Sequence, residues 1–130
     1  MAKEVPAAPK ELSVTGAYAF VAKQGSAAAA YVVITNGLDS ADVIDSVTST
    51  VSRFASMHGQ STNNGFVTMV ARDDAMVAAH DSLVLQPGGD HLMLEGVTRD
   101  LVARDTLTLT FWFRHSGPRS AVATVRDYGS

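Results

Sequence analysis

The feature that most restricts the fold is a series of short β-type segments separated by turn residues. In the clearest of them, 106–113, threonines alternate with leucines before the segment ends in Phe-Trp-Phe. A period of two places the apolar side chains on one face of a strand. Other β-branched or aromatic runs lie at 12–21, 30–35, 66–70 and 121–125. Short strands at regular spacing predict an all-β fold, either a β-sandwich or a barrel.

Turn signals divide these segments. Asn36-Gly37 follows the run 30–35, and Asn-Gly after such a run predicts a hairpin whose return strand includes residues 43–47. Asn63-Asn64-Gly65 predicts a second turn, and Pro87-Gly88-Gly89 predicts a third.

The chain has 130 residues, which fits one domain. Residues 1–11, rich in proline and alanine at their start, are expected to form a flexible lead-in, and residues 12–127 a single domain. The one segment that competes as a helix, Asp73 to Asp81, is too short to define the fold.

Composition excludes several classes of function. Hydrophobic residues make up 46% of the chain and charged residues 18%, with a net charge of −3. The basic residues are scattered, so no nucleic-acid partner is expected. No stretch approaches the ~20 apolar residues of a membrane span. The absence of cysteine excludes disulfides, thiol catalysis, zinc–thiolate sites and the thiolate of a blue-copper centre.

Four side chains stand out as candidate metal ligands. His91 and Met93 lie two apart on a predicted strand, so they share a face, directly after the Pro-Gly-Gly turn. His58 and Met69 flank the turn at 63–65, which can return both to the same end of the molecule. All four can therefore meet around one ion.

The ligand types favour copper in its lower oxidation state. Thioethers are soft ligands that select Cu(I), whereas zinc prefers thiolate, carboxylate or three imidazoles. Two imidazoles and two thioethers add no negative charge, so Cu(I) leaves the site at +1 and Cu(II) leaves it at +2. The higher charge costs more to bury without a counter-ion. Asp90 or a water molecule can alter this balance.

The residues alone leave other interpretations of the candidate ligands and of the function open. A methionine more often fills a core gap, and an isolated histidine is more often a surface or core residue. Ser82, His80 and Asp81 supply hydrolase residue types, but no Gly-x-Ser-x-Gly elbow accompanies them. A metal-free β-sandwich interaction module would have the same fold. His80 and His115 are expected on the surface, and Met57 on the face opposite His58.

The joint spacing of the four residues, H-x10-M-x21-H-x-M, resembles the signature of the PCuAC family of periplasmic copper chaperones. The block from Leu85 to Leu94 is similar to that family's Leu-x-Pro-Gly-x-x-His-x-Met-Leu segment. Ala30 to Asn36 resembles its early tyrosine-containing strand, which ends in asparagine. The resemblance covers roughly Ala17 to Val125.

The resemblance implies a cupredoxin-like Greek-key barrel with one Cu(I) per chain on His58, Met69, His91 and Met93. It implies a carrier rather than an enzyme, in an extracytoplasmic setting: the periplasm or the outer face of the cytoplasmic membrane. The implied partner is the cytochrome c oxidase subunit with the binuclear copper centre, or a copper assembly protein. A copper-storage or resistance carrier without an oxidase role is the alternative.

Two departures from that family are visible. Gly59-Gln60 follow His58 where the family usually has an acidic residue, and the chain ends without a His- and Met-rich tail. One copper site is therefore expected. Residues 1–6 lack the apolar core of a signal peptide. The chain is therefore expected either to begin with the N-terminus of a cytosolic protein or to be a mature segment whose leader or lipid anchor is absent.

Overall fold

The computed structural model describes residues 11–63, 66–72 and 75–128. Within them the chain forms ten strands and no helix, which confirms the all-β prediction. The lead-in predicted for residues 1–11 lies, apart from Glu11, outside the described residues. The strands are β1 (Leu12–Phe20), β2 (Ala28–Asn36), β3 (Asp42–Ser49), β4 (Ser52–Asn63), β5 (Phe66–Arg72), β6 (Ala75–Val77), β7 (Ser82–Val84), β8 (His91–Val97), β9 (Thr106–Phe113) and β10 (Gly117–Arg126).

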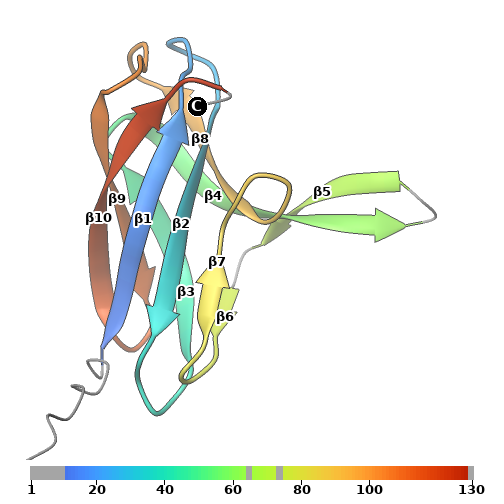
Figure 1. The fold of residues 1–130 in the computed structure, drawn as a ribbon, viewed down its shortest axis with the longest axis vertical. Coiled ribbons are helices and arrows are strands. Elements are labelled where there is room, and N and C mark those ends of the chain that lie inside the picture. Colours follow the sequence, from blue (N-terminus) through green and yellow to red (C-terminus); the bar gives the residue numbers. More distant parts are fainter. Residues whose placement is uncertain (1–10, 64–65, 73–74, 129–130) are drawn as a thin grey trace, which may run out of the picture.

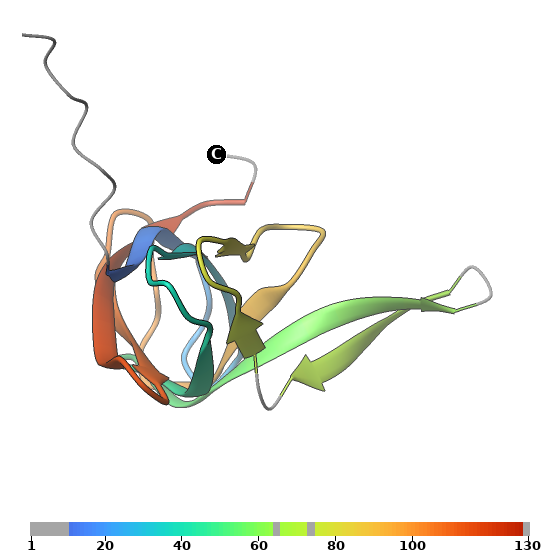
Figure 2. The same ribbon diagram turned by 90° about the horizontal axis from the view of Figure 1, so that it is seen from below.

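The strands join into one curled sheet in the order β5-β4-β8-β2-β1-β10-β9-β3-β6, with β7 also paired to β2. β1 pairs with β10 in parallel, and the other paired strands run antiparallel. The sheet closes around a single core, as the end-on view shows (Figure 2). Every strand of the body therefore has an inner face in the core and an outer face away from it.

β9 follows its sequence pattern closely. Leu107, Leu109, Phe111 and Phe113 are all buried in the core, while the intervening residues lie on the outer face. Both edges of β9 are paired, one with β10 and the other with β3. The threonine–leucine alternation thus predicted both the strand and its buried face.

The hairpin predicted at Asn36-Gly37 is wrong. β2 ends at Asn36 and the chain crosses to β3, which pairs with β9 and β6 rather than with β2. The physical reason is that Asn36 is fully buried and its side chain stabilises the bend of the chain after β2. Its amide donates to the carbonyls of Ser40 and Val77, and its Oδ1 accepts from the Leu38 N–H. Asparagine here stabilises a crossover instead of a two-residue turn.

A second buried polar residue fixes the other end of that crossover. The carboxylate of Asp42 accepts hydrogen bonds from the backbone N–H groups of Val43, His115 and Ser116, and from the Ser116 hydroxyl. Burial alone would raise the pKa of Asp42, but these hydrogen bonds together hold it below its ordinary value. Asp42 thereby ties the start of β3 to the β9–β10 turn.

β4 is a strand of 12 residues that begins at Ser52. It runs to Asn63 because β5 pairs with it from Met57↔Arg72 out to Asn63↔Phe66, which confirms the turn predicted there. Residues 64–65, in the loop itself, lie outside the described residues. The β4–β5 hairpin projects from the body of the sheet (Figures 1 and 2). β4 therefore belongs to the core at one end and to this projection at the other.

The segment that competed as a helix is not helical where it is described. Ala75–Val77 forms β6 against β3, with Ala75 and Val77 buried and Met76 exposed. This alternation belongs to a strand. In the described part of the chain there is no helix of the length and apolar character needed to cross a bilayer.

Candidate metal centre

Pairing of β4 with β8 brings the two candidate histidines together. The two strands are antiparallel, and their register places His58 directly opposite His91. The imidazole centroids are 5.8 Å apart and the ring planes differ by 15°. Two residues that are 33 positions apart in the sequence are thus direct cross-strand neighbours.

Met93 belongs to the same surface. It lies two residues after His91 and pairs with Ser56, which lies two residues before His58. Side chains two apart on a strand share a face. The opposite face of these strands carries Met57, Leu92 and other core residues, and Met57 is 4% exposed. This confirms the expectation that Met57 and His58 point to opposite sides.

Burial differs between the two histidines. His91 is only 6% exposed, whereas His58 and Met93 are half-buried. β8 pairs with β2 only through Leu92 to Leu94, and beyond Ala30 the partner of β2 becomes β7. His91 therefore begins β8 at the fork where this strand separates from β2. The centre lies on the outer face of the sheet, close to solvent on its His58 side.

The Pro-Gly-Gly turn sets the orientation of His91. This loop is closed by hydrogen bonds from the Gln86 N–H to the Asp90 carbonyl and from the Gly89 N–H to the Gln86 carbonyl. Gly88 has a φ of 84°, a conformation that glycine adopts without strain. The Gly89 carbonyl then lies 3.3 Å from His91 Nδ1. A carbonyl only accepts, so Nδ1 carries the hydrogen and Nε2 keeps a lone pair for a metal.

His58 has a different partner. Its Nε2 lies 2.8 Å from the Ser56 hydroxyl oxygen. The sequence did not single out Ser56, which lies two residues before His58 and therefore on the same face of the strand. The two histidines thus use different ring nitrogens for their hydrogen bonds.

Met69 is placed by its backbone alone. It lies on β5 opposite Gln60, two pairs beyond His58↔Ala71 towards the tip of the hairpin. The structure describes the backbone of Met69 but not its side chain. The register puts position 69 on the strand next to His58, and ligation by Met69 stays a prediction.

The separation of the two rings fits one shared ion. A metal–nitrogen bond of about 2 Å, plus about 1 Å from nitrogen to ring centre, allows centroids up to about 6 Å apart. The 5.8 Å observed is within this reach. Within the described residues no group of three or more His, Cys, Asp or Glu is arranged to hold a metal.

The remaining histidines lie elsewhere, as expected. His80 is exposed and its Nε2 is 3.0 Å from Asp39 Oδ1. His115 is also exposed. Neither shares a strand with the His58–His91 pair.

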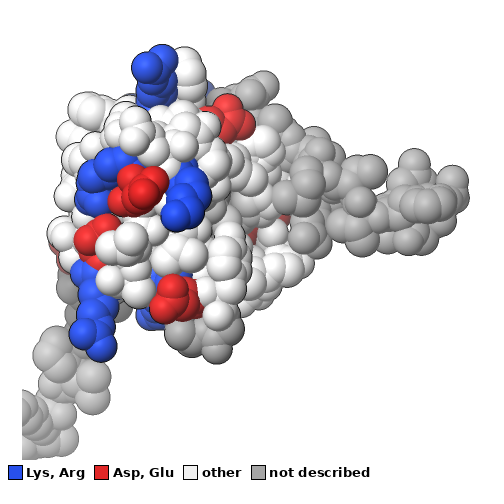
Figure 3. Space-filling model, turned by 90° about the horizontal axis from the view of Figure 1, so that it is seen from above, with Lys and Arg blue, Asp and Glu red and all other residues white. Residues whose placement is uncertain are grey.

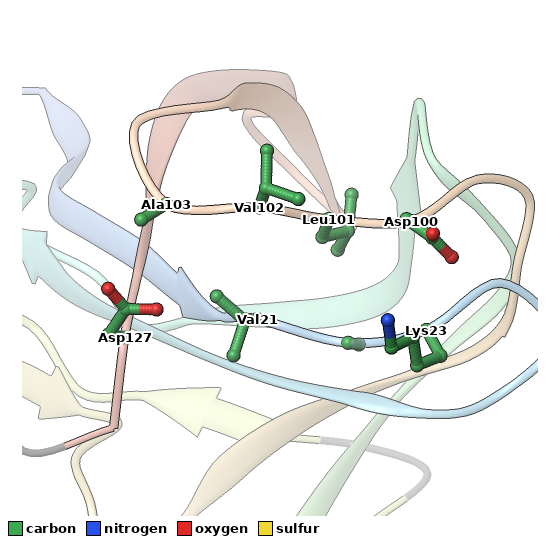
Figure 4. Close-up of a pocket in the computed structure, with 8 residues that line it drawn as sticks. Val21, Lys23, Asp100, Leu101, Val102, Ala103 and Asp127 are labelled. Atoms are coloured by element: carbon green, nitrogen blue, oxygen red, sulfur yellow. The ribbon is translucent and has the colours of Figure 1, made fainter.

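A mainly apolar hollow lies apart from the histidines. It has a volume of about 370 Å³ and lies where the end of β1 meets the β8–β9 connection (Figure 4). Val21, Leu101 and Val102 line it, with Lys23 and Asp127 among its polar residues. Seen from this end, the surface carries both basic and acidic side chains (Figure 3). Of the candidate ligands, the three whose side chains are described, His58, His91 and Met93, do not line it.

Comparison with solved structures defines the class of fold. The copper-bound PCuAC domain from PmoF2 matches with a TM-score of 0.75 at 18% identity, covering 90% of this chain and 93% of that one. The solution structure of CuI-DR1885 from Deinococcus radiodurans matches with a TM-score of 0.69 at 26% identity, covering 94% and 84%. The protein thus has the cupredoxin-like β fold of PCuAC domains, which confirms the predicted fold class.

Sequence comparison gives the family. The family model described as "Putative lipoprotein LpqE-like" matches residues 12–125. The chain is also 30% identical over 118 residues to "Putative lipoprotein Lxx21020" of Leifsonia xyli subsp. xyli (strain CTCB07), covering 90% of this chain and 70% of that protein. The chain belongs to the LpqE-like family.

Proposed function

We propose that the protein is an extracytoplasmic Cu(I) carrier that holds one ion per chain with His58, Met69, His91 and Met93. The observation that carries the proposal is the direct pairing of His58 with His91, with ring centroids 5.8 Å apart. The copper-bound state of the PmoF2 domain and the Cu(I) state of DR1885 support it, because both have this fold.

The chemistry of the donor set supports the oxidation state. Two imidazoles with two thioethers favour Cu(I) over zinc and over Cu(II). A centre on an outer face, half-buried at His58 and Met93, suits a carrier because a partner can reach and exchange its ligands one at a time. These features describe binding and transfer of the ion, and they require no catalytic group.

The family supports the proposed setting, and the resemblance to PCuAC chaperones suggests the proposed acceptor. The lipoprotein description supports a location outside the cytoplasm, at the outer face of a membrane. The proposed acceptor is the subunit of cytochrome c oxidase that holds the binuclear copper centre, or a copper assembly protein. Phe54, 68% exposed and two residues before Ser56 on the same face of β4, offers such a partner an apolar contact beside the centre.

The test is a competition titration with a Cu(I) chelator under reducing conditions. The wild-type protein is expected to bind one Cu(I) per chain, and Met69→Ala and His91→Ala to weaken binding at least about tenfold. His80→Ala is the matched control, because His80 is exposed and contacts Asp39 instead. No binding by the wild type, or equal affinity in all variants, would contradict the proposal.

A further inference from the structure

The two histidines of the centre present different nitrogens to their surroundings. At His91 the backbone carbonyl of Gly89 contacts Nδ1, so Nε2 is left with its lone pair. At His58 it is Nε2 that is engaged, by the hydroxyl of Ser56 at 2.8 Å. His91 thus has Nε2 available for a metal, whereas Nε2 of His58 already has a hydrogen-bond partner.

The position of Ser56 indicates which nitrogen of His58 faces the centre. Ser56 and Met93 are register partners on β4 and β8, and such partners have Cβ atoms about 5 Å apart. The nitrogen of His58 that reaches Ser56 Oγ thus lies on the Met93 side of the ring. An ion shared by His58, His91 and Met93 would be bound on that side, so copper and the serine hydroxyl would compete for the same nitrogen.

We propose that Ser56 is a latch on the copper site: in the metal-free protein its hydroxyl donates to His58 Nε2, and Cu(I) displaces it on loading. This inference rests on the proposed function and adds a regulatory residue to it. One hydrogen bond is broken and one copper–nitrogen bond is formed. No proton is released, because the hydroxyl keeps its hydrogen and Nδ1 keeps its own.

The latch has a physical consequence for a carrier. A neutral hydrogen bond has a small net free energy in a half-buried site, so copper can displace it. The same bond holds the ring of the empty protein in one place and is restored when copper leaves. Ser56 therefore lowers the affinity for Cu(I) and favours release, which distinguishes it from a residue that merely supports a ligand.

The affinity test compares the wild type with three serine variants by Cu(I) competition titration. Ser56→Ala is expected to bind Cu(I) about three- to tenfold more tightly, because the competing hydrogen bond is gone. Ser56→Thr keeps a hydroxyl and is expected within about twofold of the wild type. Ser52→Ala is the matched control, since Ser52 lies on the same face of β4 and contacts the Ser49 hydroxyl at 2.7 Å. Unchanged or weaker binding by Ser56→Ala overturns the latch.

A second measurement does not depend on copper. ¹⁵N NMR of the metal-free wild type is expected to show His58 with its hydrogen on Nδ1 and an unprotonated Nε2. A hydrogen on Nε2 overturns the latch, because Ser56 would then be an acceptor that orients Nδ1. A wild type that binds no Cu(I) overturns the proposed function. A wild type that binds Cu(I) more tightly than Ser56→Ala overturns the latch alone.

Discussion

β8 and β9 are built on the same alternation, yet their outer faces serve different purposes. The inner faces of both contain buried apolar residues, such as Leu92 in β8 and Phe111 in β9. The outer face of β9 carries threonines and Trp112, whereas that of β8 carries His91 and Met93. The inner residues of these strands therefore stabilise the fold, whereas the outer residues are available for functions such as metal binding.

The edges of the two strands add to this difference. β9 is paired along both sides by β10 and β3. β8 loses β2 as a partner where His91 begins it, and its other partner, β4, continues into the projecting hairpin. The candidate centre thus lies where the sheet opens, whereas β9, which is paired on both sides, carries no candidate ligand.

The largest effect should come from the inner face of β9. Phe111→Ala removes a fully buried ring and is expected to lower the free energy of unfolding by about 3–5 kcal/mol, measured by urea denaturation. Trp112→Ala, next to it but 43% exposed, is expected to cost about 1 kcal/mol. Equal losses for the two variants would break the distinction between the faces.

A smaller effect, dependent on pH, should come from Asp42 beside the β9–β10 turn. Its pKa is lowered below the ordinary value of 3.8, so its stabilising contribution is fully present above that value. The contribution is lost as the pH falls through the folded-state pKa. Asp42→Asn is expected to cost about 2 kcal/mol at pH 7 and less at pH 2, measured by urea denaturation at both values. A cost that does not change with pH would contradict this role.

The smallest effect on stability should come from the outer face of β8. Met93→Ala is expected to change the free energy of unfolding by less than about 1 kcal/mol while weakening Cu(I) binding about tenfold. Met76→Ala, at a site that is 66% exposed on β6, should change neither quantity appreciably. If Met93→Ala unfolds the protein but leaves its copper affinity intact, the outer face is structural and the comparison with β9 fails.

The sequence predicted those parts of the fold in which local patterns and tertiary packing agree. Thr106–Phe113 is such a part, because alternation alone decides its buried face. Asn36-Gly37 is the opposite case: the dipeptide favours a hairpin locally, but burial of the Asn36 side chain in a three-bond corner prevails. Contacts from residues distant in sequence, such as Val77, are not contained in a local pattern.

The candidate site was predicted from spacing, and the structure describes its four members in unequal detail. The pairing of His58 with His91 and the shared face of Met93 agree with that prediction. Ligation by the four residues stays a prediction, and Met69 is placed only by its pairing with Gln60. Ser56 was missed because a serine on a strand carries no metal signal by itself, and its role depends on a rotamer of His58 that the sequence does not specify.

The most direct measurement is an NMR titration of the protein with Cu(I) under reducing conditions, following every methionine methyl group and histidine ring. The account predicts that signals of His58, Met69, His91 and Met93 change together and saturate at one equivalent. Met76, His80 and His115 serve as internal controls and should not move. Saturation at one equivalent with any of the four unmoved, or no change at all, would contradict the claim that these residues hold one Cu(I).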